Sequence, residues 1–161
     1  MSLPNRTPAQ QDLQIFLPDE ASATRFAQIC AGHLGAGDTV LLSGPVGAGK
    51  SHFARAVIRA HLGEETEVPS PSFTLVQCYD AAFEIWHADL YRLSHSFELA
   101  ELGLEEAMGT ALCLIEWPDR LPQTPQRAIS ISLAMAGEGR MAHLSGVSPA
   151  LAGALQSAFS S

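Results

Sequence analysis

The pattern Gly-x-x-x-x-Gly-Lys-Ser, which holds phosphate groups in many unrelated proteins, runs from Gly44 to Ser51. Backbone N–H groups in such a loop, at the start of a helix, form a concave cradle for phosphate oxygens that the helix dipole strengthens. Gly44, Gly47 and Gly49 permit close approach of the backbone and unusual torsions. Lys50 would contact the terminal phosphates as a point charge, and the Ser51 hydroxyl would bind Mg²⁺. The motif therefore predicts a nucleotide-binding loop.

The surroundings of the motif distinguish it from a chance glycine-rich turn. Residues 39–43 are typical of a short buried strand, and residues 51–63 of a helix with apolar side chains along one side and a glycine at its end. Strand, glycine-rich loop and helix in this order are the context that a P-loop requires. Lys50 is also the only lysine in the chain, beside eight arginines, and it occupies the position where the loop uses lysine.

A magnesium–nucleotide site also needs an acidic residue at the tip of a strand near the loop. Glu116 follows the aliphatic run 111–115, which is typical of a buried parallel strand beside the P-loop strand. Asp89 ends the run 83–89, a less decisive pattern, and shares one face of that strand with His87, which alone does not define a metal site. A surface acid after a strand is the alternative for Glu116, and the spacing alone leaves Asp89 undecided.

The segment 64–74 lies between the P-loop helix and the next predicted strand. In GTP switches this position holds a loop that the γ-phosphate and its metal ion order. Ser70, Ser72 and Thr74 offer hydroxyl groups for such a role, and two prolines bar a helix. An inert connection stiffened by proline is the alternative.

The remaining elements complete a layered pattern. Asp19 is a candidate cap for the first helix and Gly35 a candidate stop. The predicted elements are helices at 18–37, 51–63 and from about 148, short helical pieces at 96–102 and 104–109, and strands at 39–43, 73–79, 83–93, 111–117, 128–134 and 140–146. Strands joined by short turns should pair antiparallel. The predicted fold is a P-loop NTPase-like α/β layered domain with a mixed parallel and antiparallel sheet flanked by helices.

The length and composition bound the class of protein. The 161 residues fit a single domain, 1–161, whose first 14 residues we expect to form a loosely ordered segment. An apolar content of 47% with 16% charged residues is typical of a globular chain. No apolar run is long enough to span a membrane, and the N-terminus lacks the order of a signal peptide, so we expect a cytoplasmic protein. Three scattered cysteines give neither a disulfide framework nor a zinc spacing.

The charge balance argues against direct nucleic-acid binding. The formal net charge is −8, and the arginines are spread over the whole chain. Proteins that bind RNA or DNA usually present a basic face, because neutralising phosphates supplies most of their affinity. We therefore expect any contact with nucleic acid to belong to partner proteins.

Missing features argue against a conventional GTPase and weaken the case for a small-molecule kinase, although the P-loop itself would suit a kinase. A conventional GTPase needs an Asn-Lys-x-Asp guanine reader, which this chain cannot contain because Lys50 is its only lysine. A small-molecule kinase usually closes an arginine-rich lid over the phosphates. Arg120, Arg127 and Arg140 instead stand singly between prolines and strands.

The sequence resembles the TsaE (YjeE) family in five segments of matching order and spacing: GPVGAGKS, SPSFTL, HADLYRL, ELGLEE and LIEWPDR. The resemblance covers roughly residues 17–146. It implies a small ATPase with ATP and Mg²⁺ as cofactors, which works with the TsaD and TsaB proteins to form threonylcarbamoyladenosine at position 37 of tRNA. The acidic net charge fits this function, since any contact with tRNA would then belong to the partners, and the lack of a long apolar run leads us to expect no membrane partner.

The resemblance implies residue roles as well. Lys50, Asp89, Glu116 and Thr74 match catalytic positions, with Thr74 in the switch-like segment. Ser51 and Glu116 match the residues that bind the metal ion. The expected nucleotide contacts come from Glu20, Gly44, Gly47, Ala48, Gly49, Lys50, Ser51, His52, Trp117 and Arg140.

Three residues depart from the family pattern. Pro45 replaces a frequent aspartate and removes one backbone donor, His52 replaces a threonine or small residue, and Ser72 replaces a threonine but keeps its hydroxyl. We expect weak ATP hydrolysis by the isolated chain, since no arginine stands out as a finger for the γ-phosphate. A small-molecule P-loop kinase and a non-hydrolysing nucleotide-sensing adaptor are the alternative functions.

Overall fold

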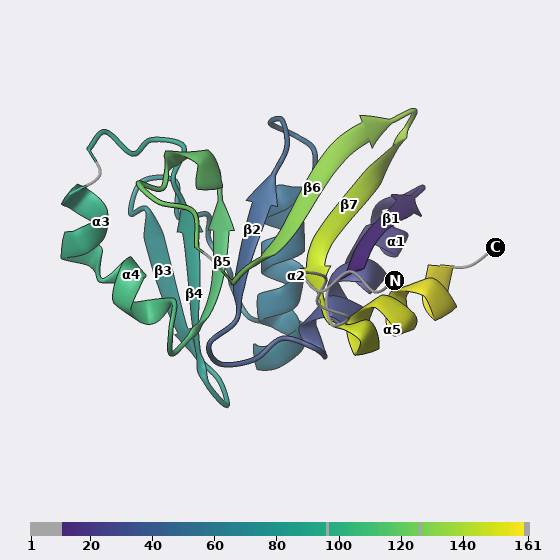
Figure 1. Cartoon of the computed structure of the whole chain (residues 1–161), viewed down its shortest axis with the longest axis horizontal. Helices are drawn as coiled ribbons and strands as arrows, with labels where there is room; N and C mark the ends of the chain where they lie inside the picture. Colours follow the sequence, from purple (N-terminus) through teal and green to yellow (C-terminus); the bar gives the residue numbers. More distant parts are fainter. Residues whose placement is uncertain (1–10, 96, 126, 160–161) are drawn as a thin grey trace, which may run out of the picture.

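A seven-stranded sheet forms the centre of the molecule (Figure 1). The computed structural model describes residues 11–95, 97–125 and 127–159. The strands lie in the order β1-β7-β6-β2-β5-β4-β3. Their bounds are β1 (Gln11–Leu17), β2 (Thr39–Ser43), β3 (Val76–Asp80), β4 (Glu84–Asp89), β5 (Leu112–Glu116), β6 (Ile129–Ala136) and β7 (Gly139–Val147). The helices are α1 (Glu20–Ala31), α2 (Lys50–Leu62), α3 (Phe97–Leu102), α4 (Leu104–Ala107) and α5 (Pro149–Phe159), with a 3₁₀ turn at Pro118–Arg120.

The middle of the sheet is parallel and its outer strands are antiparallel. β2 pairs in parallel with both β5 and β6, and β4 pairs in parallel with β5. β3 with β4, β6 with β7, and β1 with β7 are antiparallel pairs. The predicted mixed sheet is thereby confirmed. Because β2, β4 and β5 run in the same direction, their carboxyl ends meet at one edge.

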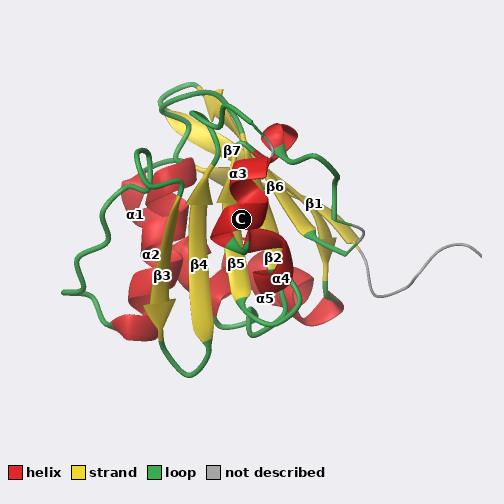
Figure 2. Ribbon diagram, turned by 90° about the vertical axis from the view of Figure 1, so that its left-hand side faces the viewer, coloured by secondary structure: helices red, strands yellow, loops and turns green. Residues whose placement is uncertain are grey.

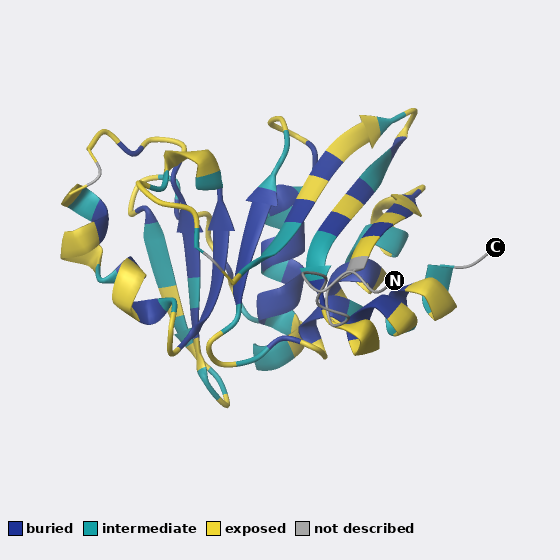
Figure 3. Ribbon diagram, viewed as in Figure 1, coloured by how far each residue is buried: buried dark blue, intermediate teal, exposed yellow. Residues whose placement is uncertain are grey.

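Helices cover the sheet on both faces, so the domain has three layers (Figure 2). α1, α2 and α5 pack on one face, where Phe26, Phe53 and Leu155 meet Leu42 and other side chains of the sheet. α3 and α4 pack on the opposite face, over the side chains that alternate with these along the strands, such as Leu41 and Ile115. β2 and β5 are therefore buried along almost their whole length, as Figure 3 shows. None of the described helices is long and apolar enough to cross a membrane.

The N-terminal edge strand corrects one prediction. Residues 11–14 belong to β1 and are not loosely ordered, whereas residues 1–10 lie outside the described part of the chain. The signal was present in the sequence, since Leu13, Ile15 and Leu17 are buried and the residues between them are exposed. This period of two is typical of a strand with one face on the core.

Three predicted element ends also move. α1 begins after the Asp19 cap, whose side chain accepts a hydrogen bond from Ser22 N, but it ends at Ala31 with Gly32 as its cap and not at Gly35. β3 begins only at Val76, because Leu75 adopts a left-handed conformation with φ of 68°. β4 stops at Asp89, and a turn follows at residues 91–92. Local turns determine where these elements end, and the pattern of side chains does not reveal such turns.

Two glycines give opposite predictions for stability. Gly146 has φ of +77°, and a Cβ there would lie 2.6 Å from the Ala128 carbonyl oxygen. We expect Gly146→Ala to lower the free energy of unfolding by about 1–3 kcal/mol, the usual range for such backbone strain. Gly153 lies inside α5 with nothing within 4 Å of its Cβ position. Gly153→Ala should raise the free energy of unfolding by up to ~1 kcal/mol, because alanine favours the helix.

Urea denaturation of both variants measures these changes. A Gly146→Ala protein as stable as the parent chain would mean that the backbone at Gly146 and Ala128 relaxes without strain.

Candidate nucleotide-binding site

The P-loop connects the end of β2 to the start of α2. Residues 44–49 turn between Ser43 and Lys50, and Gly44, Gly47 and Gly49 all have positive φ. A Cβ on Gly44 would overlap the carbonyl oxygen of Leu133 in β6. Only glycine fits there, because the loop lies directly against the neighbouring strand. The predicted order of strand, loop and helix is confirmed.

The Lys50 amine folds back into the loop. Its Nζ donates hydrogen bonds to the carbonyl oxygens of Gly44, at 2.6 Å, and Pro45, at 2.9 Å. It also lies 4.3 Å from the centre of the Trp117 ring, a cation–π contact. Burial lowers the pKa of Lys50, and the negative charges of Glu116 and Asp89 oppose this shift. The lysine therefore occupies the concave side of the loop, where phosphate oxygens would be stronger acceptors than carbonyls.

Glu116 lies beside Ser51 at the tip of β5. The Ser51 hydroxyl donates to Glu116 Oε1 at 2.8 Å, although 65 residues separate the two in sequence. Glu116 is only 2% exposed, so the alternative of a surface acid is wrong. Its other oxygen, Oε2, lies 2.6 Å from Nε2 of His87, a residue that the sequence analysis left without a role.

Asp89 ends β4 directly beside Glu116, its partner in the register of the two parallel strands. It is buried, and its Oδ1 accepts a hydrogen bond from the backbone N–H of Tyr91 at 3.1 Å. The Tyr91 ring packs against Trp117 with the ring centres 4.9 Å apart. Trp117 follows Glu116 with a φ of 60°, a left-handed conformation that a non-glycine residue adopts at a cost of about 1–3 kcal/mol.

A cavity of about 560 Å³ joins these groups on the acidic side of the loop. Lys50, Ser51, Asp89, Glu116 and Trp117 all line it, as the sequence predicted for one site. Ser72, one of the three hydroxyl residues proposed for a nucleotide-sensing loop, also lines it. The lining further includes residues that the sequence analysis did not select: Val46, Arg55, Phe73, Tyr91 and Arg92. Arg55 could have been found, because it lies one helical turn after Ser51 and so on the same face of α2. No sequence signal pointed to Phe73, whose ring lies 4.7 Å from the Arg92 guanidinium carbon.

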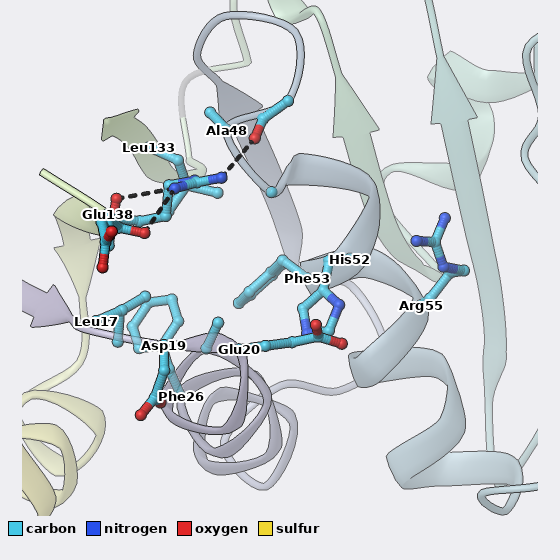
Figure 4. A pocket seen from close by; sticks show the side chains of 15 residues that line it. Leu17, Asp19, Glu20, Phe26, Ala48, His52, Phe53, Arg55, Leu133 and Glu138 are labelled. Carbon is cyan, nitrogen blue, oxygen red and sulfur yellow. Dashed lines mark hydrogen bonds between the residues drawn. The ribbon is translucent and has the colours of Figure 1, made fainter. Parts of the chain in front are cut away.

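A second cavity, of about 500 Å³, lies on the other side of the loop, between α1 and the β6–β7 hairpin (Figure 4). Glu20, Ala48, His52 and Arg140 line it together, although the first and last are 120 residues apart by their numbers. Arg140 Nη2 donates to the carbonyl oxygen of Gly47 at 3.1 Å, which ties the hairpin to the loop. Leu17, Phe26, Phe53 and Leu133 give this cavity an apolar wall.

His52 is held between α1 and α2. Its Nε2 is 2.9 Å from the Thr24 hydroxyl. Burial lowers the pKa of His52, Arg55 and Arg59 lower it further, and Glu20 opposes them. In Figure 4 Glu20 and His52 lie beside each other across the cavity from Glu138.

Thr74 is the predicted site residue that the structure does not bring to the others. It is exposed, lines neither cavity, and its hydroxyl accepts a weak hydrogen bond from Gln77 at 3.3 Å. Ser72 and Phe73 of the same segment face the larger cavity instead. The Thr74 side chain therefore lies outside both cavities, next to Leu75 with its left-handed backbone, and its catalytic role stays a prediction.

The arrangement of parts defines a class of protein. The glycine-rich loop lies between β2 and α2. The acid Glu116 at the end of the adjacent parallel strand β5 contacts the Ser51 hydroxyl, which follows the loop lysine. This is the arrangement of a P-loop NTPase-like domain. A family model described as "Threonylcarbamoyl adenosine biosynthesis protein TsaE" matches residues 17–142. The chain belongs to the TsaE family, which takes part in the biosynthesis of threonylcarbamoyladenosine in tRNA.

Relatives and a solved structure agree with this assignment. The TsaE protein of Rickettsia conorii is 45% identical over 104 residues, which cover 64% of this chain and 59% of that protein. The Rickettsia bellii protein is 41% identical over 124 residues (74% and 86%), and the Haemophilus influenzae protein 36% over 117 residues (68% and 73%). The match thus spans less than two thirds of the R. conorii protein. The crystal structure of Bacillus subtilis YdiB shares the fold, with a TM-score of 0.72 at 24% identity over 94% of this chain and 99% of that one.

Trp117 should report on a ligand that reaches Lys50. We expect a polyphosphate in the loop to draw the Lys50 amine from its position 4.3 Å from the ring and so to change Trp117 fluorescence. Trp86→Phe leaves Trp117 as the only tryptophan for this titration with inorganic triphosphate or ATP. Lys50→Ala in that background serves as the control and should remove the change.

Proposed function

We propose that this chain is a Mg–ATP-dependent ATPase subunit that acts with the TsaD and TsaB proteins to form threonylcarbamoyladenosine at position 37 of tRNA. The observation that carries the proposal is the 2.8 Å contact between Ser51 and the buried Glu116, beside the Lys50 amine. A hydroxyl, a carboxylate and one amine converge where a triphosphate and its metal ion would lie.

The donor set fits a magnesium ion. Mg²⁺ prefers oxygen ligands and is usually bound by one or two protein groups, with phosphates and water completing its octahedron. Ser51 Oγ and the Glu116 carboxylate are such groups. In the described ranges, no group of three or more histidine, cysteine, aspartate or glutamate residues is placed to hold a metal ion. When bound, the ion would neutralise charge on the β- and γ-phosphates.

Asp89 fits the role of positioning the attacking water. Its carboxylate lines the same cavity as Ser51 and Glu116, and the Tyr91 N–H holds one of its oxygens. A fixed acceptor in this place orients a water molecule for attack in line with the bond that breaks.

The smaller cavity fits the nucleoside. Its apolar wall suits a flat base, and Glu20, His52 and Arg140 supply polar groups at the rim. The two cavities share Gly47, Gly49, His52 and Arg55, so one nucleotide can place its base in one cavity and its terminal phosphate in the other.

The partners complete the proposed activity in the cytoplasm. With a net charge of −8, the chain is unsuited to bind tRNA itself, so the RNA contact is assigned to TsaD and TsaB. Arg92 lies against Phe73 and not against an acid, and a catalytic arginine can supply a factor of ~10³–10⁵ in rate. Hydrolysis by the isolated chain should therefore be slow and should rise when the partners bind.

Phosphate release with and without TsaD and TsaB tests the proposal. We expect slow release alone, faster release in the complex, and none above background for Lys50→Ala, because the loop loses its only amine. Arg127→Ala is the matched control, since it also removes one positive charge but from an exposed residue that lines neither cavity. Phosphoryl transfer to a metabolite would indicate a kinase instead, and tight partner binding without phosphate release would indicate an adaptor.

Glu116→Gln separates the metal role from nucleotide binding. The amide keeps the size of the side chain but loses the charge that holds Mg²⁺. We expect Mg²⁺-dependent hydrolysis to fall by roughly 10-fold or more, with a smaller loss of ATP affinity. Equal losses in both measurements would mean that Glu116 only supports the fold of the loop.

A further inference from the structure

A histidine lies buried beneath the acid of the candidate site. His87 belongs to β4, two residues before Asp89, and has no exposed surface. It pairs in the strand register with Leu114, while Asp89 pairs with Glu116. The ring therefore reaches diagonally from β4 to the tip of β5, where its Nε2 lies 2.6 Å from Glu116 Oε2.

Both carboxylate oxygens of Glu116 accept a hydrogen bond, one from His87 and one from Ser51. An ionised carboxylate only accepts hydrogen bonds, so we assign an N–H group to Nε2 of His87, which donates a hydrogen bond to Oε2. Ser51 donates to the other oxygen, Oε1, from the first turn of α2. Two donors on two different elements thus fix the rotation of one carboxylate.

Packing alone does not explain a histidine in this place. Its Nδ1 is buried and has no hydrogen-bond partner among the described residues. Burying an unpartnered polar atom is unfavourable, and an aliphatic side chain would avoid it. The contact with Glu116 is what compensates for burying the ring.

We propose that His87 is a positioning residue of the magnesium–nucleotide site: its Nε2–H holds the Glu116 carboxylate so that Oε1 faces the Ser51 hydroxyl. This inference rests on the proposed function. His87 lines neither cavity, and its Nε2 is already engaged, so the ring acts through Glu116 and does not touch the nucleotide. Residues that orient a metal ligand in this way typically change metal affinity or activity by ~10–100-fold when they are replaced.

The test compares three variants by metal binding and not only by turnover. His87→Leu removes the donor, and His87→Gln restores an N–H group on a flexible chain. His61→Leu is the matched control, because His61 also buries an unpartnered Nε2, packs on Phe83, and lines neither cavity. The probes are Mn²⁺ with a non-hydrolysable ATP analogue, followed by electron paramagnetic resonance, and a fluorescent ADP analogue in EDTA.

We expect His87→Leu to weaken Mn²⁺ binding by ~10–100-fold and to leave metal-free ADP binding unchanged. His87→Gln should recover much of the affinity, and His61→Leu should behave like the parent chain. The inference is overturned if His87→Leu binds Mn²⁺ normally, if His87→Gln is equally impaired, or if ADP binding in EDTA falls in parallel. If the parent chain does not bind the nucleotide analogues, the proposed function itself is refuted.

A measurement on the unaltered protein keeps the inference testable if a variant fails to fold. The ¹⁵N chemical shifts of the His87 ring should show the proton on Nε2. A ring with its proton on Nδ1 alone could not donate to Glu116 and would overturn the proposal.

Discussion

The burial of the Glu116 carboxylate is the constraint on which the site depends. A buried carboxylate is strongly unfavourable unless hydrogen bonds and a nearby positive charge compensate for its lost hydration. Here Ser51 and His87 each donate to one oxygen, and the charge of Lys50 interacts with it. These partners come from α2 and β4, while the acid ends β5. Only the parallel arrangement of β2, β5 and β4 brings them to one edge of the sheet.

The sheet also supports the shape of the loop. Gly44 lies directly against the Leu133 carbonyl of β6, and Arg140 of β7 holds the Gly47 carbonyl, so the sheet supports the loop from one side. Lys50 engages two carbonyl oxygens of its own loop and the face of Trp117. The cradle is therefore largely formed in advance, and the lysine contacts are the ones that a phosphate group would replace.

Sequence patterns predicted the local parts of this site well. The P-loop, the aliphatic strand before Glu116 and the lone lysine are features that neighbouring residues determine, and each lies where its pattern indicated. The patterns could not show that His87 reaches Glu116, which lies 29 residues later in the sequence. That contact depends on the register between β4 and β5. The patterns also could not show that the Thr74 side chain lies outside both cavities, because the left-handed conformation of the next residue, Leu75, is not visible in the sequence.

The edge strand β1 shows a different limit of prediction from sequence. Its alternation of buried and exposed side chains was visible, but a short pattern near a terminus is also compatible with a loose segment until its partner is known. β1 is held by β7, whose Met141 pairs with Phe16 and lies 125 residues later in the chain. Pairing over such a separation is decided by the whole fold and not by the segment itself.

The charges around the larger cavity explain why the metal ion and the nucleotide should bind together. Its lining contains the cations Lys50, Arg55 and Arg92 and the acids Asp89 and Glu116. The two acids offset most of this positive charge, so a bare triphosphate would meet carboxylates close to its terminal group. A divalent cation reverses the sign of that interaction, because the same carboxylates then face positive charge. The overall charge of −8 matters less, since salt screens exposed charges beyond about 8 Å at physiological ionic strength. Local charge at the loop therefore determines whether a nucleotide binds in this cavity.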